Sequence, residues 1–256
     1  MSDKPAPTPA EKAPAKRKRA AKTKAEDAPA PKPRLWRVVA KWLGRGLGAF
    51  AAFYAVLILL FSFLPPPINL YQLGEAWRLG GIEKDWVSWE EIAPVMGRSA
   101  VAAEDANFCD HWGFDMAAIR QAIEEGSNRG ASTISQQVVK NVFLWHGRSY
   151  LRKALEAVLT PVVELVWSKE RVLHVYLNVA EFDEGVFGVQ AAAQHYFGVD
   201  AKDLSALQAA RLAAVLPDPK GRDAANPSSF VRSRTRSIIS GAETIAADGR
   251  SACFEG

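Results

Sequence analysis

The chain has 256 residues, enough for one domain with appendages, and nearly half of its residues are apolar. Its net charge of +4 is unevenly distributed, because residues 1–45 carry thirteen Lys and Arg against four Asp and Glu, whereas residues 46–256 carry nineteen against twenty-four. The basic character therefore belongs to an N-terminal arm, and the remainder lacks the positive excess of a nucleic-acid-binding domain.

The arm consists mainly of Pro, Ala, Lys and Arg, with almost no large apolar side chains. Such a segment cannot bury enough surface to offset its ordering entropy, so we predict a disordered cytoplasmic tail over residues 1–36. The basic run at residues 16–19 is also typical of nucleic-acid binding. Because an apolar span follows it, we expect no nucleic-acid partner.

That span is an uncharged run of nineteen residues, Gly46–Leu64. At about 1.5 Å per residue it just crosses a hydrocarbon core about 30 Å thick. Trp36 and Trp42 suit a membrane interface, and the basic residues before the span place that end in the cytoplasm. We therefore predict a transmembrane anchor over residues 37–65. A cleaved signal peptide is the alternative, but no small-residue cleavage site follows the run.

After a predicted linker over residues 66–87, apolar residues recur with helical spacing, which predicts a mainly α domain over residues 88–250. A capping box at Ser88 predicts the first helix, although Pro94 falls early in it and favours a shifted start. Further helices are expected over residues 117–125, from Ser132 or Thr133 to about 145, over 150–166 with a kink at Pro161, and over 169–178, 187–196, 204–216 and 227–247.

No convincing period-two pattern is present, so no strands are expected. Loops are expected over residues 107–113, 126–131 and 178–185. Cys109 and Cys253 have no metal-ligand spacing, and the pattern identifies no certain metal site. If the domain lies outside the cytoplasm, these two cysteines can form one disulfide; the alternative is a buried thiol and a free thiol near the C-terminus.

Glu104 ends the apolar run of the first helix and lies near aromatic residues in the sequence. Partial desolvation beside aromatic rings raises the pKa of a carboxylate toward neutrality, which suits a general base. An ordinary surface carboxylate near a turn is the alternative interpretation.

A second polar cluster places Gln137, Lys140 and Asn141 on one face of a helix. The hydroxyls of Ser132 and Thr133 stand at the N-terminus of that helix, where an anion or a sugar hydroxyl can bind. A solvated amphipathic face is the alternative.

A third cluster combines Arg148, Arg152 and Lys153 with Glu156. The pair formed by Arg152 and Glu156 has the i, i+4 spacing of an ordinary helix salt bridge. The functional interpretation requires the positive charges to hold a pyrophosphate beside Glu156.

Together these segments resemble family 51 glycosyltransferases, the peptidoglycan glycosyltransferases, in their monofunctional form without a transpeptidase. The motif Glu-Asp-x-x-Phe-x-x-His-x-Gly matches residues 104–113, and Gly-x-Ser-Thr-Ile-x-Gln-Gln-x-x-Lys-Asn matches residues 130–141. Arg-Lys-x-x-Glu matches residues 152–156. A fourth motif ends in Tyr-Leu-Asn at residues 176–178, where His174 departs from a frequent Glu at a position that we interpret as structural.

The resemblance implies a lysozyme-like, mainly α fold with a second, membrane-proximal lobe. It also implies that lipid II is polymerised into linear glycan strands. The GlcNAc 4-hydroxyl of an acceptor attacks C1 of the donor MurNAc and displaces polyprenyl pyrophosphate with inversion. The enzyme would be a single-pass protein of the bacterial inner membrane, with its catalytic domain in the periplasm.

The resemblance further assigns roles to individual residues. Glu104 is the implied general base, and Glu156 is the implied second catalytic residue, assisting the leaving pyrophosphate. No cofactor is required if side-chain cations pair with the pyrophosphate directly; Mg²⁺ at the pyrophosphate is the alternative. The implied substrate-binding residues are Asp105, Phe108, His111, Ser132, Thr133, Gln137, Lys140, Asn141, Arg148, Arg152 and Lys153.

The implied partners are lipid II, the growing glycan chain and the membrane, with other cell-wall synthesis proteins as further candidates. Two other functions stay open on the residues alone. A glycan-cleaving enzyme of lysozyme type shares a catalytic Glu, but a neutral glycan does not require the basic cluster. An anchored scaffold for cell-wall or division proteins would make the polar motifs ordinary helix faces.

Overall fold

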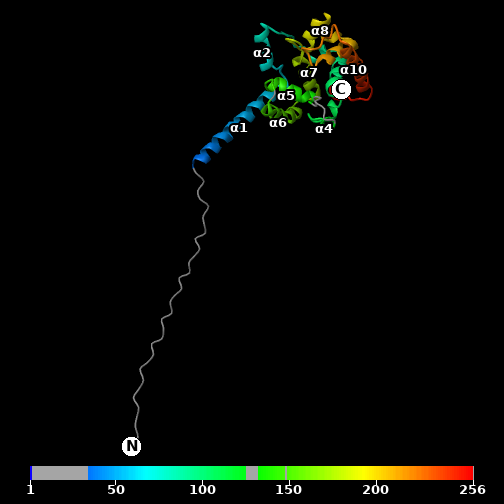
Figure 1. The fold of residues 1–256 in the computed structure, drawn as a ribbon. Coiled ribbons are helices and arrows are strands. Elements are labelled where there is room, and N and C mark those ends of the chain that lie inside the picture. The colour runs from blue at the N-terminus through cyan, green and yellow to red at the C-terminus, as the bar shows by residue number, and fades with distance from the viewer. Residues whose placement is uncertain (2–33, 125–131, 148, 256) are drawn as a thin grey trace. The chain divides into compact units, whose positions relative to one another are not determined.

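The computed structural model describes residues 1, 34–124, 132–147 and 149–255, and it divides into two units, residues 1–49 and 50–256. Helix α1 (Arg34–Phe61) begins in the first unit and ends in the second (Figure 1). The tail predicted over residues 1–36 lies outside the described residues, except for Met1 and for its last three residues, which belong to α1.

Within the described part of the chain, one helical segment, Leu35–Phe61, is long and apolar enough to cross a membrane by length and composition. Its C-terminal end is tied into the second unit. Ile58 is buried, and its carbonyl oxygen accepts a 2.7 Å hydrogen bond from the Trp167 indole. The Arg171 guanidinium donates to the carbonyl oxygens of Phe61 and Leu64. The end of the span is therefore fixed to the helix that carries Arg171.

The second unit is mainly α, as predicted. Capping side chains stand at the starts of several helices, among them Asp115, Thr133, Ser149, Ser168 and Ser228. Thr133 is one of the two alternatives predicted for its helix. The helices are α2 (Leu70–Leu79), η1 (Trp89–Glu91), α3 (Pro94–Glu104), η2 (Phe108–Asp110), α4 (Met116–Glu124), α5 (Ile134–Phe143), α6 (Tyr150–Val166), α7 (Lys169–Val179), α8 (Val189–Phe197), η3 (Ala201–Asp203), α9 (Ala206–Val215), α10 (Ser229–Ala247) and α11 (Ala252–Glu255).

The structure corrects the first predicted helix. The capping box at Ser88 opens only the short turn η1, and α3 begins with Pro94 at its first position. Proline at that position has no backbone donor to lose and already has a helical φ, whereas inside a helix starting at residue 89 it would disrupt the hydrogen bonding. The helix α6 runs continuously through Pro161, and the predicted kink stays a prediction.

The expectation of no strands was wrong. Three short strands, β1 (Glu83–Lys84), β2 (Glu181–Asp183) and β3 (Val186–Phe187), form a sheet in the order β1-β3-β2. Strands of two or three residues are too short to produce a period-two pattern. The predicted linker over residues 66–87 contains α2 and β1, and the predicted loop over 178–185 contains β2. The predicted loop over 126–131 lies outside the described residues.

The open question of the two cysteines is answered, because Cys109 and Cys253 form a disulfide with a Cα–Cα distance of 5.7 Å. It joins η2 to α11. The rings of Phe108 and Phe254 lie beside it, 6.4 Å apart. The C-terminal end of the described chain is therefore held against the loop that follows Glu104.

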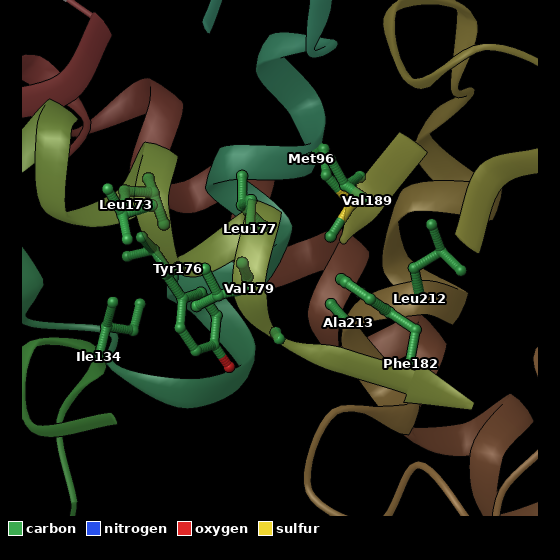
Figure 2. Close-up of a cluster of buried hydrophobic side chains, with 14 of the residues drawn as sticks. Met96, Ile134, Leu173, Tyr176, Leu177, Val179, Phe182, Val189, Leu212 and Ala213 are labelled. Carbon is green, nitrogen blue, oxygen red and sulfur yellow. The ribbon is translucent and has the colours of Figure 1, made fainter. Parts of the chain in front are cut away.

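The core is organised around α7. Leu173, Tyr176 and Leu177 are almost completely inaccessible, and nearly every residue from Val172 to Val179 is buried. A helix that is buried on most of its sides belongs at the centre of a domain. Figure 2 shows its side chains among those of the surrounding elements, with Ile134 of α5, Met96 of α3 and Leu212 of α9.

Candidate active site

Two adjoining pockets, of about 610 and 200 Å³, form the candidate site. They share four lining residues: Gln137 and Lys140 of α5, with Leu216 and Pro217 after α9. The larger pocket is further lined by Ala103, Glu104, Ser132, Arg222, Phe230 and Arg234. The smaller is further lined by Asn69, Tyr71, Asn141, His146, Tyr176, Val179, Ala180, Glu181, Phe187 and Pro219.

Glu104, the last residue of α3, faces the larger pocket. The Gln137 amide donates to Glu104 Oε2 at 2.9 Å and so fixes the orientation of the carboxylate. Burial raises the pKa of Glu104, although the Gln137 hydrogen bond and the charges of Arg234 and Arg222 oppose that rise. A desolvated carboxylate that lines a pocket is equipped to take a proton from a bound hydroxyl.

The neighbouring carboxylate, Asp105, serves the framework. Its Oδ2 accepts from the Ile134 backbone N–H at 3.0 Å, and its Oδ1 lies 2.8 Å from His111 Nε2. The Ile134 N–H belongs to the first turn of α5, where unpaired donors and the helix dipole favour a carboxylate. Asp105 therefore joins the end of α3 to the start of α5, the helix that carries Gln137 and Lys140.

Several predicted binding residues lie behind the pockets. Asp105, Phe108 and Thr133 are buried, and none of these three or His111 lines either pocket as the described residues define it. Thr133 caps α5 and donates to the Gly113 carbonyl at 2.7 Å. Their contacts are with the protein, so they position the residues that line the pockets.

Glu156 is the centre of a separate charge cluster on α6. It is 2% exposed. Arg152 donates to its Oε2 at 2.7 Å, and Lys153 donates to its Oε1. Lys153 also donates to the Ser132 hydroxyl at 3.3 Å, and Ser132 lines the larger pocket. The i, i+4 pair expected from the sequence is thus present, and it is linked through Lys153 to the pocket of Glu104.

Lys140 connects the two pockets, and burial lowers its pKa. The charge of Glu156 opposes that shift, so the two groups interact electrostatically. The predicted residue Arg148 lies outside the described residues. Asn141 lines the smaller pocket. Of the predicted residues that are described, the structure brings Glu104, Ser132, Gln137, Lys140 and Asn141 to the cleft.

Other residues of the cleft were not predicted from the sequence. Arg222 and Arg234 flank Glu104, while Tyr71 and His146 line the smaller pocket. The Tyr71 and His146 rings are 3.8 Å apart, and burial lowers the pKa of His146 to about 4. These residues come from segments outside the recognised motifs, and no local pattern in the sequence marks them.

A partly buried ion pair, which supports the loop that follows Glu104, was also not predicted. Lys169 Nζ lies 2.8 Å from Glu164 Oε1 and donates to the His111 carbonyl at 2.7 Å. The Ser135 hydroxyl donates to the same Glu164 oxygen. The pair crosses from α6 to α7, so it has neither of the spacings at which side chains on one helix meet.

Among residues 34–124, 132–147 and 149–255, no group of three His, Cys, Asp or Glu side chains is arranged to hold a metal ion. Both oxygens of Glu156 are engaged by side-chain cations. The larger pocket is lined by the cationic side chains of Lys140, Arg222 and Arg234.

Comparison with known proteins gives consistent matches. Residues 73–243 match the family model described as "Transglycosylase". The "Biosynthetic peptidoglycan transglycosylase" of Jannaschia sp. (strain CCS1) is 61% identical over 218 residues, covering 85% of this chain and 91% of that protein. Proteins of the same name from Pseudomonas putida (strain W619) and Cronobacter sakazakii (strain ATCC BAA-894) are each 50% identical, over 75% of this chain and 86% and 84% of their own lengths.

The link made by Asp105 leads to a stability prediction. In Asp105→Ala, the Ile134 N–H and the His111 ring lose their buried acceptor, so we expect the free energy of unfolding to fall by about 2–3 kcal/mol. Thermal unfolding of the detergent-solubilised protein measures this. Asp110→Ala, at an exposed position, is the matched control and should change stability by less than about 0.5 kcal/mol. Equal melting temperatures for the two variants would contradict the assigned role.

Proposed function

The chain belongs to the transglycosylase family, and on this premise we propose that it polymerises lipid II into linear glycan strands, with Glu104 as the general base. It is a peptidoglycan glycosyltransferase. The observation that carries the detailed proposal is that a desolvated carboxylate, Glu104, and a partly buried ammonium group, Lys140, line the same pocket.

In the proposed reaction, Glu104 takes the proton of the acceptor's GlcNAc 4-hydroxyl as that oxygen attacks C1 of the donor MurNAc. The bond between C1 and the pyrophosphate oxygen breaks, and polyprenyl pyrophosphate leaves with its electron pair, inverting the configuration at C1. The raised pKa of Glu104 supports this role, because a more basic carboxylate is a better proton acceptor. Gln137 holds Oε2, which leaves Oε1 to face the hydroxyl.

Charge on the leaving pyrophosphate must be balanced, and we assign this to Lys140 together with Arg148, Arg152 and Lys153. Burial lowers the pKa of Lys140 and so disfavours its charged form. An anion bound beside Lys140 would favour the charged form and pair with it. Glu156 orients Arg152 and Lys153 through its two oxygens. Preorganised cations of this kind supply electrostatic stabilisation of the transition state.

The remaining predicted residues divide into two roles. Ser132, Gln137 and Asn141 line the cleft and are proposed to contact sugar or phosphate oxygens. The other predicted residues are proposed to position the loop that follows Glu104, in keeping with their contacts to other protein groups. They are Asp105, Phe108, His111 and Thr133. The cations favour a pyrophosphate-bearing substrate over the neutral glycan of a lysozyme-type hydrolase. The raised pKa of Glu104 favours an enzyme over a scaffold, because a scaffold does not need a base.

We propose that residues 37–65 anchor the chain in the bacterial inner membrane, with the N-terminus in the cytoplasm and the domain over residues 88–250 in the periplasm. The apolar helix supports the anchor, and the basic residues before it support the orientation. The disulfide between Cys109 and Cys253 supports an oxidising compartment. The lipid of the substrate then lies in the bilayer that holds the enzyme.

Replacing the base tests the proposal most directly. Glu104→Gln keeps the size of the side chain but cannot accept the proton, so we expect polymer formation from lipid-linked disaccharide to fall by about 10²–10⁴-fold. Gel separation of the glycan products measures this, with the exposed Glu243→Gln as control. Equal polymer from Glu104→Gln would refute the base assignment. A wild-type protein that only shortens existing glycan would establish the hydrolase instead.

The charge of Arg234 provides a test of the pKa of Glu104. Glu104 must be deprotonated to act, so kcat should fall as the pH drops through a pKa higher than that of an ordinary Glu. Arg234 lowers this pKa, and Arg234→Gln should therefore move the acidic limb of the pH profile to higher pH. Arg236→Gln, an exposed position on the same helix, is the control. An unmoved limb in Arg234→Gln would count against Glu104 as the titrating group.

Direct pairing of side-chain cations with the pyrophosphate predicts independence from divalent ions. The initial polymerisation rate should be the same with chelator as with Mg²⁺, while Lys140→Met should lower it by about 10²–10³-fold. The exposed Lys202→Met serves as control. Loss of activity with chelator, followed by recovery on adding Mg²⁺, would show instead that a metal ion balances the charge.

A further inference from the structure

The helix α2 is amphipathic in the opposite sense to an ordinary surface helix. Its exposed face is apolar, because Leu70, Leu73 and Trp77 form one stripe with i, i+3, i+7 spacing and are 67%, 59% and 91% exposed. Its inward face is polar, with Gln72 and Glu75 buried. A helix at the surface of a soluble domain has the reverse arrangement.

The inward face is held by specific contacts, so the stripe cannot turn inward without breaking them. The Tyr71 hydroxyl donates to Glu181 Oε2 at 2.6 Å, and Lys220 Nζ donates to Glu75 Oε2 at 3.0 Å. A reciprocal capping box between Asn69 and Gln72 fixes the first turn. Exposure of the stripe is therefore a consequence of how α2 is attached to the domain.

The apolar surface continues in the sequence from the end of the candidate span to α2. Phe63, Leu64 and Ile68 lie between the two helices and are also exposed. Exposed apolar residues gathered in this way mark a contact with lipid or with another apolar partner.

Both ends of this connection are attached to α7. Arg171 binds the carbonyl oxygens of Phe61 and Leu64, while the Gln72 amide donates to the Val179 carbonyl. Eight residues of helix separate Arg171 from Val179, a rise of about 12 Å. The headgroup layer on each side of a bilayer is about 5–8 Å thick. The two attachments therefore differ in depth by at most about 12 Å, somewhat more than the thickness of that layer, which keeps the first turn of α2 near the end of the span.

We propose that α2 lies in the headgroup region of the bilayer, with Leu70, Leu73 and Trp77 in contact with lipid. Leucine inserts below the headgroups, and tryptophan is suited to the interface itself. Arg78 is paired with Glu75 and Glu184, so the contact depends on apolar insertion and does not require anionic lipid. This inference rests on the proposed anchoring of α1 in the membrane.

The consequence for the enzyme concerns Tyr71. It projects from the opposite side of α2 into the wall of the smaller pocket, which Lys140 also lines. An α-helix is about 10 Å across, so this wall of the cleft would stand one helix diameter above the lipid contact. The bilayer surface would then set the height at which the cleft meets the pyrophosphate of a membrane-embedded substrate.

A nitroxide label at Leu73→Cys tests the proposal in the full chain, reconstituted in phosphatidylcholine vesicles. The native cysteines are joined in the disulfide, so only the introduced thiol is labelled. Matched labels at Phe53→Cys in the span and at Leu207→Cys, an exposed position on α9, provide the membrane and water references. The measurement is the ratio of accessibility to oxygen, which concentrates in lipid, over accessibility to a water-soluble nickel complex.

We expect the ratio at position 73 to exceed that at position 207 several-fold and to approach that at position 53, with Trp77→Cys repeating the result. A water-like ratio at 73 beside a lipid-like ratio at 53 would overturn the inference while leaving the anchor intact. Shielding of 73 from both reagents would show a protein partner and would also overturn it. A water-like ratio at 53 would remove the anchor itself, and with it both this inference and the proposed location.

Discussion

The buried carboxylate of Asp105 is the interaction on which the candidate site depends. It accepts from the first turn of α5 and from His111, and in doing so it fixes where α3 ends. The preceding residue, Glu104, is thereby held against Gln137, which lies one turn into α5. A single side chain thus determines the relation between the proposed base and the helix that carries Lys140, even though it does not itself line the cleft.

The two proposed catalytic glutamates occupy different electrostatic environments. Glu104 faces a pocket with an amide as its hydrogen-bond partner, and burial raises its pKa. Glu156 is more deeply buried but is bound by two cations, Arg152 and Lys153. A carboxylate with a raised pKa suits proton transfer, whereas one held in ion pairs suits the orientation of charge. The two environments therefore support different proposed roles, proton transfer for Glu104 and orientation of cations for Glu156.

The sequence predicted those parts of the fold that depend on local patterns. The capping residues Thr133, Ser149 and Ser168 mark helix starts because the capping interaction involves only neighbouring residues. The interpretation of His174 as structural also agrees with its contacts, since its ring lies 2.8 Å from the Val87 carbonyl. Neither α2, which falls in a predicted linker, nor the three short strands could be found in this way, because α2 exposes its apolar side and the strands are too short.

The difference between local patterns and tertiary contacts also explains which residues of the site were predicted. The motif residues Glu104, Gln137 and Lys140 were found because they stand at fixed spacings in the sequence. Arg222, Arg234 and Tyr71 reach the cleft from three other segments, and only the tertiary structure brings them there. Residues that line the cleft could not be separated by sequence from those that support it, since Glu104 and Asp105 are adjacent acidic residues whose side chains point to different surroundings.

The central helix α7 connects these features. Its first turns hold the end of the candidate membrane span through Arg171, its middle contributes Tyr176 to the smaller pocket, and its last residue, Val179, accepts from α2. Because nearly all of α7 after Arg171 is buried, it cannot shift without disturbing the core around it. The end of the span, the cleft and α2 are therefore fixed relative to one another within the second unit. In the proposed reaction the lipid of the substrate lies in the bilayer and its reacting sugar lies above it, so this fixed relation would hold the cleft at one height over the membrane.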